Sequence, residues 1–600
     1  MTEVVLDPAD RRLALGATGV LRELNEIGVL EAADIHVARR LTGLVDDDDP
    51  DVALAVALAV RAVRGGSVCV DLTTLATDPQ LGPLSWPEPG AWMAALRASA
   101  LLTPPDGQPA VLRLHDDRLL YLDRYWREEA QVCADLMTRL ASGTSEAAAD
   151  IEASLDRVFP AEGYEEQRAA ARIALSQRTT VLTGGPGTGK TTTVAALLAL
   201  LLEQDPRARV ALAAPTGKAA ARLQQAVEEE VAALPDATDR ARLTGLRAVT
   251  LHRLLGSRPD TSVRFRHHRD NRLPHDVIVV DETSMISLTM MARLLEAVRD
   301  RTRLILVGDP DQLTSVEAGA VLGDLVDGLG RRPDHLIAEL RTSHRFGAAI
   351  RGLAEAVRDG DAEAALAALR AGDEHVVFVE RGADGDDSPA HDDAAVSERL
   401  RDLVAPHAHE VWKASAAGDA VRALALLDEQ RLLCAHRDGP YGVRHWNEQV
   451  ERWLADRTGE AVGAQWYVGR PLLVTANDYG LGIYNGDVGV CVQGDQGLRA
   501  HIAAGTPLDL APGRLGDVDT MHAMTIHKSQ GSQAGTVIVL LPPPDSRLLT
   551  RQLLYTAITR ARTRVVLVGS ADDVRAAVTR PATRATGLAE RLGAPPGVQP

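Results

Sequence analysis

A glycine-rich segment at residues 183–191 combines the residue types that bind a polyphosphate. It reads TGGPGTGKT, follows a β-branched run at 180–183 and precedes an apolar helical pattern at 192–202. In the pattern GxxxxGK(S/T), glycines let backbone N–H groups turn towards phosphate oxygens, and the start of the helix adds a favourable dipole. We expect Lys190 to reach the β- and γ-phosphates of ATP and the Thr191 hydroxyl to ligate Mg²⁺. The nucleotide-binding residues predicted from this segment are Gly184, Gly185, Pro186, Gly187, Thr188, Gly189, Lys190, Thr191 and Thr192.

An apolar run at residues 277–280 ends in two carboxylates, Asp281 and Glu282. After a phosphate loop, one carboxylate in this position suits a contact to Mg²⁺, and we assign that role to Asp281. The second suits activation of the attacking water, which we assign to Glu282. Buried acids at a strand end are costly without a partner, so a cation is expected there.

A third polar segment, GDPDQ at residues 308–312, follows the apolar run at 304–307. Its side chains are expected to face the same cleft, where Gln312 would sense the γ-phosphate or orient water. The alternative is a proline-containing turn that takes no part in the chemistry.

Short β-branched runs alternate with helical patterns from about residue 164 onward. This alternation is typical of a parallel α/β sheet. The first series of runs lies at residues 180–183, 210–214, 277–280 and 304–307, and the second at 376–379, 432–435, 537–541 and 565–568. We therefore predict two α/β sheets in tandem, with the acidic segment 382–393 between them as a surface loop.

The length of 600 residues is too great for one hydrophobic core. We predict a mainly helical N-terminal domain at residues 1–150, where none of these motifs occurs, a first α/β domain at 151–345 and a second at 346–600. A basic, turn-rich stretch indicates a small insertion at about 256–275 in the first α/β domain. A glycine-rich stretch of short strands indicates a small β insertion at about 468–517 in the second.

The composition is that of a globular chain with a net charge of −18. This charge argues against a large basic surface for duplex DNA, although it is compatible with a local basic channel between domains. The four cysteines form no CxxC pair, which argues against a metal site built from them. Because no apolar run reaches the roughly 18 residues of a membrane span and no secretory signal is seen, we expect a cytoplasmic location.

The motifs, taken in order, resemble those of superfamily 1 helicases and, more closely, of their RecD-like group. The resemblance begins with YEEQRAAARIAL around Gln167, the phosphate loop, APTGKAAARL from residue 214 and TLHRLLG from residue 250. It continues with VVDETSMI, LVGDPDQLTSVEAG, LRTSHRF, NDYGLGIYNGDVG, TIHKSQGSQ and LLYTAITRAR. Each segment alone is of weak to moderate specificity, but the full set in this order, from about residue 167 to 562, is very specific.

The resemblance implies an α/β fold of two tandem RecA-like P-loop domains with ATP held between them. Gln167 would contact the adenine, while Arg345 and Arg560 would reach the γ-phosphate from the far side of the cleft. An arginine in this role supplies roughly 10³–10⁵ in rate. Two positions depart from the family pattern: Gln533 stands where a glutamate often touches the ribose, and Pro310 stands where a basic residue is often found.

The resemblance also places single-stranded DNA across the tops of both α/β domains. Hydroxyls, backbone N–H groups and lysines suit a phosphate track that reads no base sequence. For His252, a core or capping role is as acceptable as a contact to the strand. The predicted DNA-binding residues are Pro215, Thr216, Lys218, His252, Thr525, His527 and Lys528.

The activity implied by the family is that of an ATP-dependent single-stranded-DNA translocase and 5′–3′ DNA helicase. One kind of RecD-like protein is the α subunit of exodeoxyribonuclease V, which works in double-strand-break repair beside the larger RecB and RecC chains. The other kind is a stand-alone helicase with a longer N-terminal region that carries helix-hairpin-helix elements. The short, acidic N-terminal region favours the subunit, with RecB-like and RecC-like partners and the nuclease on a partner chain. A stand-alone helicase, a non-translocating ATP switch and an RNA helicase remain as alternatives.

Overall fold

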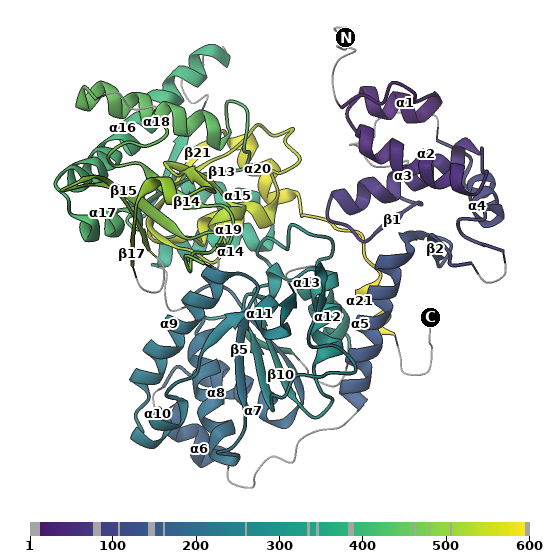
Figure 1. Cartoon of the computed structure of the whole chain (residues 1–600), viewed down its shortest axis with the longest axis horizontal. Helices are drawn as coiled ribbons and strands as arrows, with labels where there is room; N and C mark the ends of the chain where they lie inside the picture. Colours follow the sequence, from purple (N-terminus) through teal and green to yellow (C-terminus); the bar gives the residue numbers. More distant parts are fainter. Residues whose placement is uncertain are drawn as a thin grey trace.

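The computed structural model of the chain contains an N-terminal domain and two α/β domains (Figure 1). For residues 258, 261–263 and 389–395 it describes the backbone alone. The described residues are 12–75, 86–105, 108–141, 151–159, 162–258, 261–332, 337–343, 347–381, 389–460, 464–478, 480–503 and 507–594.

The N-terminal domain is built around α3 (Pro50–Arg64), whose sequence PDVALAVALAVRAVR is almost entirely apolar. The helix begins at Pro50 because the Asp49 carboxylate accepts the Asp51 N–H at 2.9 Å and caps it. Packed around it are α1 (Gly19–Glu26), α2 (Ala32–Leu44), α4 (Pro89–Ala98) and an antiparallel sheet of β1 (Cys69–Asp71), β3 (Leu119–Leu122) and β2 (Leu112–His115). The prediction of a mainly helical region is confirmed, and the three-stranded sheet was not predicted.

The first α/β domain has a six-stranded parallel sheet in the order β11-β4-β10-β9-β5-β6. The runs at 210–214, 277–280 and 304–307 in its central strands are continuously apolar, because helices cover both faces of the sheet. In order across the sheet they are β11 (Ile337–Leu340), β4 (Thr179–Gly184), β10 (Arg303–Gly308), β9 (Val277–Val280), β5 (Val210–Ala214) and β6 (Ala248–Thr250).

Two hydrophobic cores lie on the two faces of this sheet. One face is covered by α6 (Ile151–Val158), α7 (Glu165–Ser176), α8 (Lys190–Gln204), α9 (Gly217–Ala233) and α10 (Ala237–Leu243). The other is covered by α11 (Leu251–Leu255), α12 (Leu288–Ala297) and α13 (Val321–Gly330). The predicted small insertion contains an antiparallel pair, β7 (Ser257–Arg258) and β8 (Thr261–Phe265).

The second α/β domain has a five-stranded parallel sheet in the order β12-β21-β20-β13-β19. Its strands are β12 (Val376–Glu380), β21 (Ala561–Gly569), β20 (Ala534–Leu540), β13 (Gln430–Cys434) and β19 (Ala523–Thr525). Its helices are α14 (Ala348–Asp359), α15 (Ala362–Arg370), α16 (Pro389–Ala416), α17 (Ala420–Leu427), α18 (Val443–Thr458), α19 (Arg551–Ile558) and α20 (Ala571–Thr579). The eight predicted β-branched runs all coincide with strands of the two sheets, so the prediction of tandem α/β sheets is confirmed.

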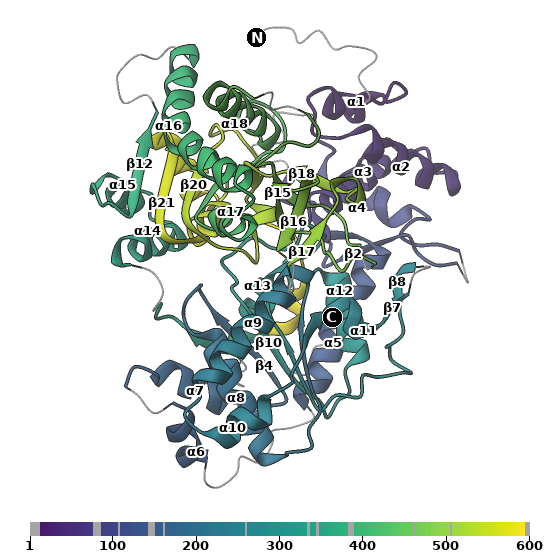
Figure 2. The ribbon, with the colours of Figure 1, turned by 60° about the vertical axis from the view of Figure 1, so that its left-hand side comes forward.

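The predicted β insertion of the second α/β domain is a five-stranded antiparallel sheet in the order β17-β16-β15-β14-β18 (Figure 2). Its strands are β14 (Pro471–Val474), β15 (Val488–Gly494), β16 (Gly497–Ala503), β17 (Leu508–Leu510) and β18 (Val518–Thr520). It has a separate small core that includes Leu472, Cys491 and Ile502.

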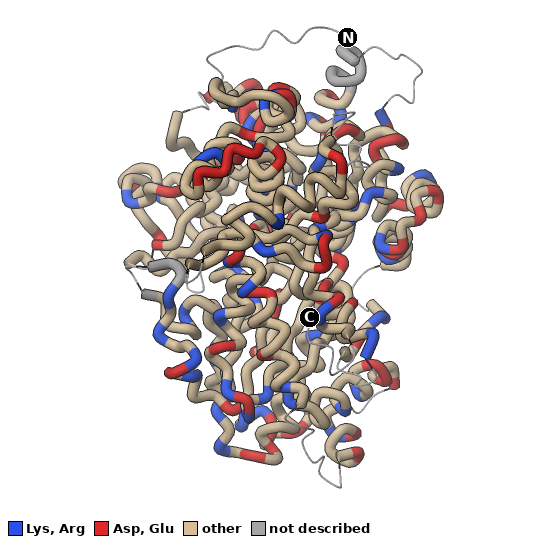
Figure 3. Tube along the Cα trace, turned by 90° about the vertical axis from the view of Figure 1, so that its right-hand side faces the viewer, with Lys and Arg blue, Asp and Glu red and all other residues tan. Residues whose placement is uncertain are grey.

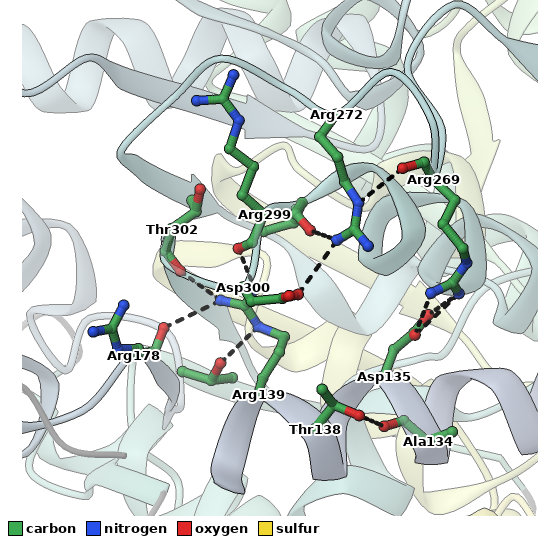
Figure 4. Close-up of polar contacts among 12 residues, drawn as sticks. Ala134, Asp135, Thr138, Arg139, Arg178, Arg269, Arg272, Arg299, Asp300 and Thr302 are labelled. Carbon is green, nitrogen blue, oxygen red and sulfur yellow. Dashed lines mark hydrogen bonds and ion pairs between the residues drawn. The ribbon is translucent and has the colours of Figure 1, made fainter. Parts of the chain in front are cut away.

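The helix α5 (Asp123–Ala141) joins the N-terminal domain to the first α/β domain and is anchored there by Arg139 (Figure 4). The Arg139 guanidinium donates to the Thr179 hydroxyl at 3.0 Å and to the carbonyls of Arg299 and Thr302 at 2.7 and 2.5 Å. Burial lowers the pKa of Arg139 to about 10. The sequence placed this helix in the N-terminal domain, whereas in the structure it packs against α12 of the first sheet.

The C-terminal segment also returns to the first α/β domain. After α20, the chain forms α21 (Leu588–Gly593), which packs against α13 and α5 rather than against the second sheet. Arg591 forms an ion pair with Glu129 at 2.9 Å, and the two side chains are 4% and 0% exposed. Arg584 donates to the carbonyls of Glu317 and Gly319 at 3.0 and 3.3 Å. This segment therefore ties the second α/β domain to the first and to α5.

Basic and acidic residues are interspersed along the chain in the view of Figure 3. Among the described residues, no helix is long and apolar enough to cross a membrane, and no group of three or more His, Cys, Asp or Glu residues could hold a metal ion. The four cysteines are free thiols.

Candidate active site

A cavity of about 940 Å³ lies at the carboxyl ends of β4, β9 and β10, where the two α/β domains meet. Ligands of open parallel sheets bind at this edge. Most lining residues come from the first α/β domain, and Gln533 and Arg560 come from the second. The predicted site residues that line it are Gln167, Pro186, Gly187, Gly189, Lys190, Thr191, Thr192, Asp281, Glu282, Gln312 and Arg560.

The predicted phosphate loop forms the turn between β4 and α8. A Cβ atom on Gly184 would lie 2.6 Å from the Leu340 carbonyl oxygen and 2.6 Å from the Thr188 hydroxyl, so no side chain fits there. Gly189 caps α8 with φ of 85°, a left-handed conformation that favours glycine. The Lys190 ammonium donates to the carbonyls of Gly184 and Gly185 at 2.5 and 2.9 Å, which holds it across the loop.

Gln167 on α7 packs directly against this loop. Its Nε2 donates to the Thr188 carbonyl at 3.1 Å, and its side chain is 1% exposed. Among the described residues, the buried Oε1 of Gln167 has no hydrogen-bond partner. A buried carbonyl acceptor without a donor is costly, and an amino group such as that of adenine would satisfy it. The unpartnered acceptor therefore fits the purine contact predicted for Gln167.

Asp281 and Glu282 follow β9 at the cavity wall. Burial, together with the negative charge of Glu282, raises the pKa of Asp281 to about 6, and the positive charge of Lys190 acts against this shift. Glu282 has φ of 51°, which is uncommon for a residue with a side chain and is typical of strained functional positions. Carboxylate and hydroxyl oxygens are the ligands that Mg²⁺ prefers, so Asp281 with Thr191 of the same cavity fits this ion.

A chain of side-chain contacts crosses from the first α/β domain to the second at the cavity floor. Gln312 donates through Nε2 to Asp309 Oδ2 at 2.8 Å and accepts from Arg560 Nη2 at 3.0 Å. Tyr555 of the second domain donates its hydroxyl to Asp309 Oδ2 at 3.3 Å. Asp309 is 2% exposed, and burial raises its pKa. Arg560 is 3% exposed, and burial lowers its pKa to about 10.

Residues next to Gln312 and Tyr555 make further contacts between the two α/β domains. The Leu313 N–H donates to the Thr556 hydroxyl at 2.8 Å, and Gln530 donates to the Leu313 carbonyl at 2.7 Å. The N–H and the carbonyl of Leu313, which follows Gln312, are therefore both bonded to the second α/β domain. Gln312 therefore belongs both to the cavity lining and to the contact between the domains.

Arg345, predicted as the second arginine of the site, lies outside the described residues, so its role stays a prediction. Its described neighbour Ser343 donates to the Pro186 carbonyl of the phosphate loop at 3.1 Å. The two positions that depart from the family pattern differ in their relation to the cavity. Gln533 lines the cavity, whereas Pro310 is not among its lining residues.

The predicted strand-binding residues of the first α/β domain lie where β5 leads into α9. Thr216 caps the helix by accepting the Ala219 N–H at 3.2 Å. Among the described residues, the buried ammonium of Lys218 has no hydrogen-bond partner, and burial lowers its pKa to about 7. A Cβ on Gly217 would lie 2.6 Å from Tyr484, so the second domain's insertion contacts the start of α9. Lys218 therefore lies under the insertion rather than on an open surface.

The strand-binding residues predicted in the second α/β domain lie at the end of β19. Thr525 accepts the Lys528 N–H at 3.2 Å, and the Lys528 ammonium is paired with Asp519 at 3.1 Å. Burial lowers the pKa of His527. His252 on α11 packs edge-on against Phe265 with ring centroids 5.8 Å apart, which suits either alternative proposed for it.

Several residues of the site were not singled out from the sequence. Asp309 and Tyr555 both lie inside motifs that carried the resemblance, but nothing in their spacing indicated that they meet. Arg222 lines the cavity from α9, and Glu230 of the same helix accepts from the Thr192 hydroxyl at 2.8 Å. A signal was available for Arg222, because a helix that follows a strand of this sheet starts at the edge where ligands bind. Glu230 lies near the end of α9, and that signal does not extend to it.

Comparisons with known proteins identify the family. Three family models match: "AAA domain" at residues 167–318, "UvrD-like helicase C-terminal domain" at 520–568 and "RecBCD enzyme subunit RecD, N-terminal domain" at 26–121. The RecBCD enzyme subunit RecD of Mycolicibacterium smegmatis is 64% identical over 94% of this chain and 98% of its own length. The ATP-dependent RecD2 DNA helicase of Deinococcus radiodurans is 30% identical over 79% of this chain and 59% of its own length.

Among solved structures, a Pif1 helicase from Bacteroides in complex with ADP-AlF3 and ssDNA aligns with 67% of this chain and 91% of that one, at 18% identity and a TM-score of 0.37. The identity and mutual coverage of the curated RecD relative decide the family, in agreement with the prediction from the motifs. The chain therefore belongs to the RecD family of RecBCD enzyme subunits, and it is an ATP-dependent DNA helicase.

Proposed function

We propose that ATP is bound and hydrolysed in the cavity between the two α/β domains. The observation that carries the proposal is that Lys190 of one domain and Arg560 of the other line this single cavity. Lys190 binds the β- and γ-phosphates, and the backbone N–H groups of the loop at 184–192, other than Pro186, surround them. Gln167 accepts from the adenine amino group through its spare Oε1.

The remaining residues act on the transferring phosphoryl group. Thr191 and Asp281 would hold Mg²⁺, which would supply positive charge beside the phosphate oxygens. Glu282 accepts a proton from the attacking water, and Gln312 orients that water. Arg560 stabilises the charge that develops on the γ-phosphate oxygens, and Arg345 is proposed to share this role.

Hydrolysis is coupled to movement through the contacts between the domains. Arg560, Gln312 and Asp309 link the cavity to both domains, so the state of the γ-phosphate changes how the domains are held. The strand lies across Pro215 and Thr216 of the first domain and Thr525, His527 and Lys528 of the second, with His252 at its side, and Lys218 lies beside this path under the insertion. Alternate opening and closing would move this strand, and we propose the 5′–3′ direction.

We propose that the chain works as the motor subunit of a heterotrimer with RecB-like and RecC-like chains in the cytoplasm, with the nuclease on a partner. Three features support this: the 98% coverage of the RecD subunit, the lower 59% coverage of the stand-alone RecD2 helicase, and the match at 26–121 to a RecD N-terminal domain. The N-terminal domain, with Leu15 and Leu44 82% and 60% exposed, would then dock on a partner.

The proposal is tested by ATP turnover of the full-length chain without nucleic acid, with single-stranded DNA and with RNA of the same sequence. Stimulation by DNA and faster unwinding of a duplex with a 5′ tail are expected. Equal turnover in all three conditions would indicate an ATP switch, and stimulation by RNA alone would indicate an RNA helicase. Affinity purification from the native cell should recover two larger chains with this one, and their absence would favour a stand-alone helicase.

A further inference from the structure

The helix α9 connects the predicted strand path to the nucleotide cavity. It begins directly after Thr216, and its first turn carries Lys218. Farther along, Arg222 and Glu230 line the cavity. Positions four residues apart lie on one face of an α-helix, so Lys218 and Arg222 are successive residues along one face.

Arg222 faces the cavity without a partner of its own. It is half-buried, and within the part of the chain that the structure describes its guanidinium forms no ion pair or hydrogen bond. The other two cations of the cavity differ, because Lys190 donates to the loop carbonyls and Arg560 donates to Gln312. A half-buried guanidinium has lost part of its hydration, which an anion entering the cavity would replace.

The charged groups near Arg222 belong to the nucleotide cavity and to the predicted strand path. Burial is the main cause of the shifted pKa values of Asp281, Arg560 and Lys218, and the Arg222 charge contributes to the pKa of all three. Asp281 and Arg560 belong to the nucleotide cavity, whereas Lys218 belongs to the predicted strand path. The charge of Arg222 therefore acts on ionisable groups of both the nucleotide cavity and the predicted strand path.

We propose that Arg222 contacts the terminal phosphate of bound ATP and couples strand binding at the start of α9 to hydrolysis. This inference rests on the nucleotide site and strand path proposed above. A guanidinium offers a planar fork of donors that matches phosphate oxygens. Because one helical turn rises only about 5.4 Å, a strand that shifts or rotates the first turn of α9 moves Arg222 with it.

The test compares Arg222→Gln, which removes the charge, with Arg222→Lys, which keeps it. Arg247→Gln is the matched control, because Arg247 belongs to the same domain, is 77% exposed and is not among the cavity-lining residues. For each full-length variant, kcat and KM for ATP are measured with and without saturating oligo(dT), and oligo(dT) affinity is measured by fluorescence anisotropy. Circular dichroism melting reports whether each variant is folded.

Arg222→Gln should lower the DNA-stimulated kcat by about tenfold or more, as expected for loss of a charge-assisted hydrogen bond. The rate without DNA should fall less, so the ratio of the two rates shrinks while oligo(dT) affinity stays within about twofold. Arg222→Lys should recover part of the ratio and remains informative if Arg222→Gln does not fold. A wild-type ratio in both variants, or a raised KM with unchanged kcat, would overturn the inference. Absence of DNA stimulation in the wild-type chain would instead refute the proposed function.

Discussion

Replacing Arg560 with alanine removes a guanidinium that crosses from the second α/β domain to the first. Arg560 is 3% exposed and donates to Gln312 Oε1 at 3.0 Å and to the Thr556 carbonyl at 3.1 Å. Gln312 keeps its bond to Asp309 at 2.8 Å, so the first-domain side of the contact remains ordered in the variant. Lys190 and Gln167 are untouched, and nucleotide binding should therefore persist.

The expected loss of rate follows from the role of the removed charge. An arginine that stabilises a transferring phosphoryl group contributes roughly 10³–10⁵ in kcat, or about 4–7 kcal/mol of barrier. The cost to folding is smaller, because the unpaired Gln312 Oε1 loses one hydrogen bond, worth about 1–3 kcal/mol. Arg560→Ala should thus reduce turnover far more than it reduces stability.

The assay is single-turnover ATP hydrolysis with saturating single-stranded DNA, together with titration of a fluorescent ATP analogue. Arg562→Ala is the control, because Arg562 lies two residues away, is exposed and donates to the Asp428 carbonyl at 3.0 Å. A loss of less than tenfold in Arg560→Ala, or weakened binding with a normal maximal rate, would refute the assignment of Arg560 to the phosphoryl group.

Three further changes probe the site and its support. Lys190→Ala should abolish ATP hydrolysis with an unchanged circular dichroism spectrum; retained DNA-dependent turnover would contradict the phosphate-site assignment. Arg591→Ala leaves Glu129, 0% exposed, without its ion-pair partner and should destabilise the fold by about 3–5 kcal/mol in urea unfolding. The control Arg97→Ala removes an exposed ion pair with Asp117 and should cost less than about 1 kcal/mol; similar losses in the two variants would argue against the buried pair. Burial raises the pKa of Asp324 from 3.8 to about 8, so the unfolded chain loses this proton at lower pH than the folded chain. Between these two pH values the free energy of unfolding should fall by about 1.4 kcal/mol per pH unit as pH rises. Asp324→Asn should flatten this part of the pH profile of the melting temperature, and an unchanged profile would exclude a buried neutral acid at this position.

Much of the site was predictable because its elements are local in sequence. The phosphate loop needs only a strand, a run of glycines and the start of a helix within residues 179–204, and the sequence signals all three. The strands at 210–214 and 277–280 have the predicted bounds because both faces of the sheet are covered and every position is apolar. The carboxylates after such a strand necessarily lie at the ligand-binding edge.

Other features arise only from long-range packing. Arg560 meets Gln312, and Tyr555 meets Asp309, across a separation of more than 240 residues, which no local pattern encodes. The expectation of an accessible phosphate track did not anticipate that Lys218 is buried under the insertion of the other domain.

The sequence by itself determined the two α/β sheets, the identity of the phosphate-binding residues and the family, because hydrophobic periodicity and motif spacing act over a few tens of residues. Only the tertiary structure decided that α5 and α21 belong against the first sheet and that the two domains share one cavity. The apolar faces of those helices suit any partner surface equally well, so their place depends on which surface the rest of the chain leaves uncovered.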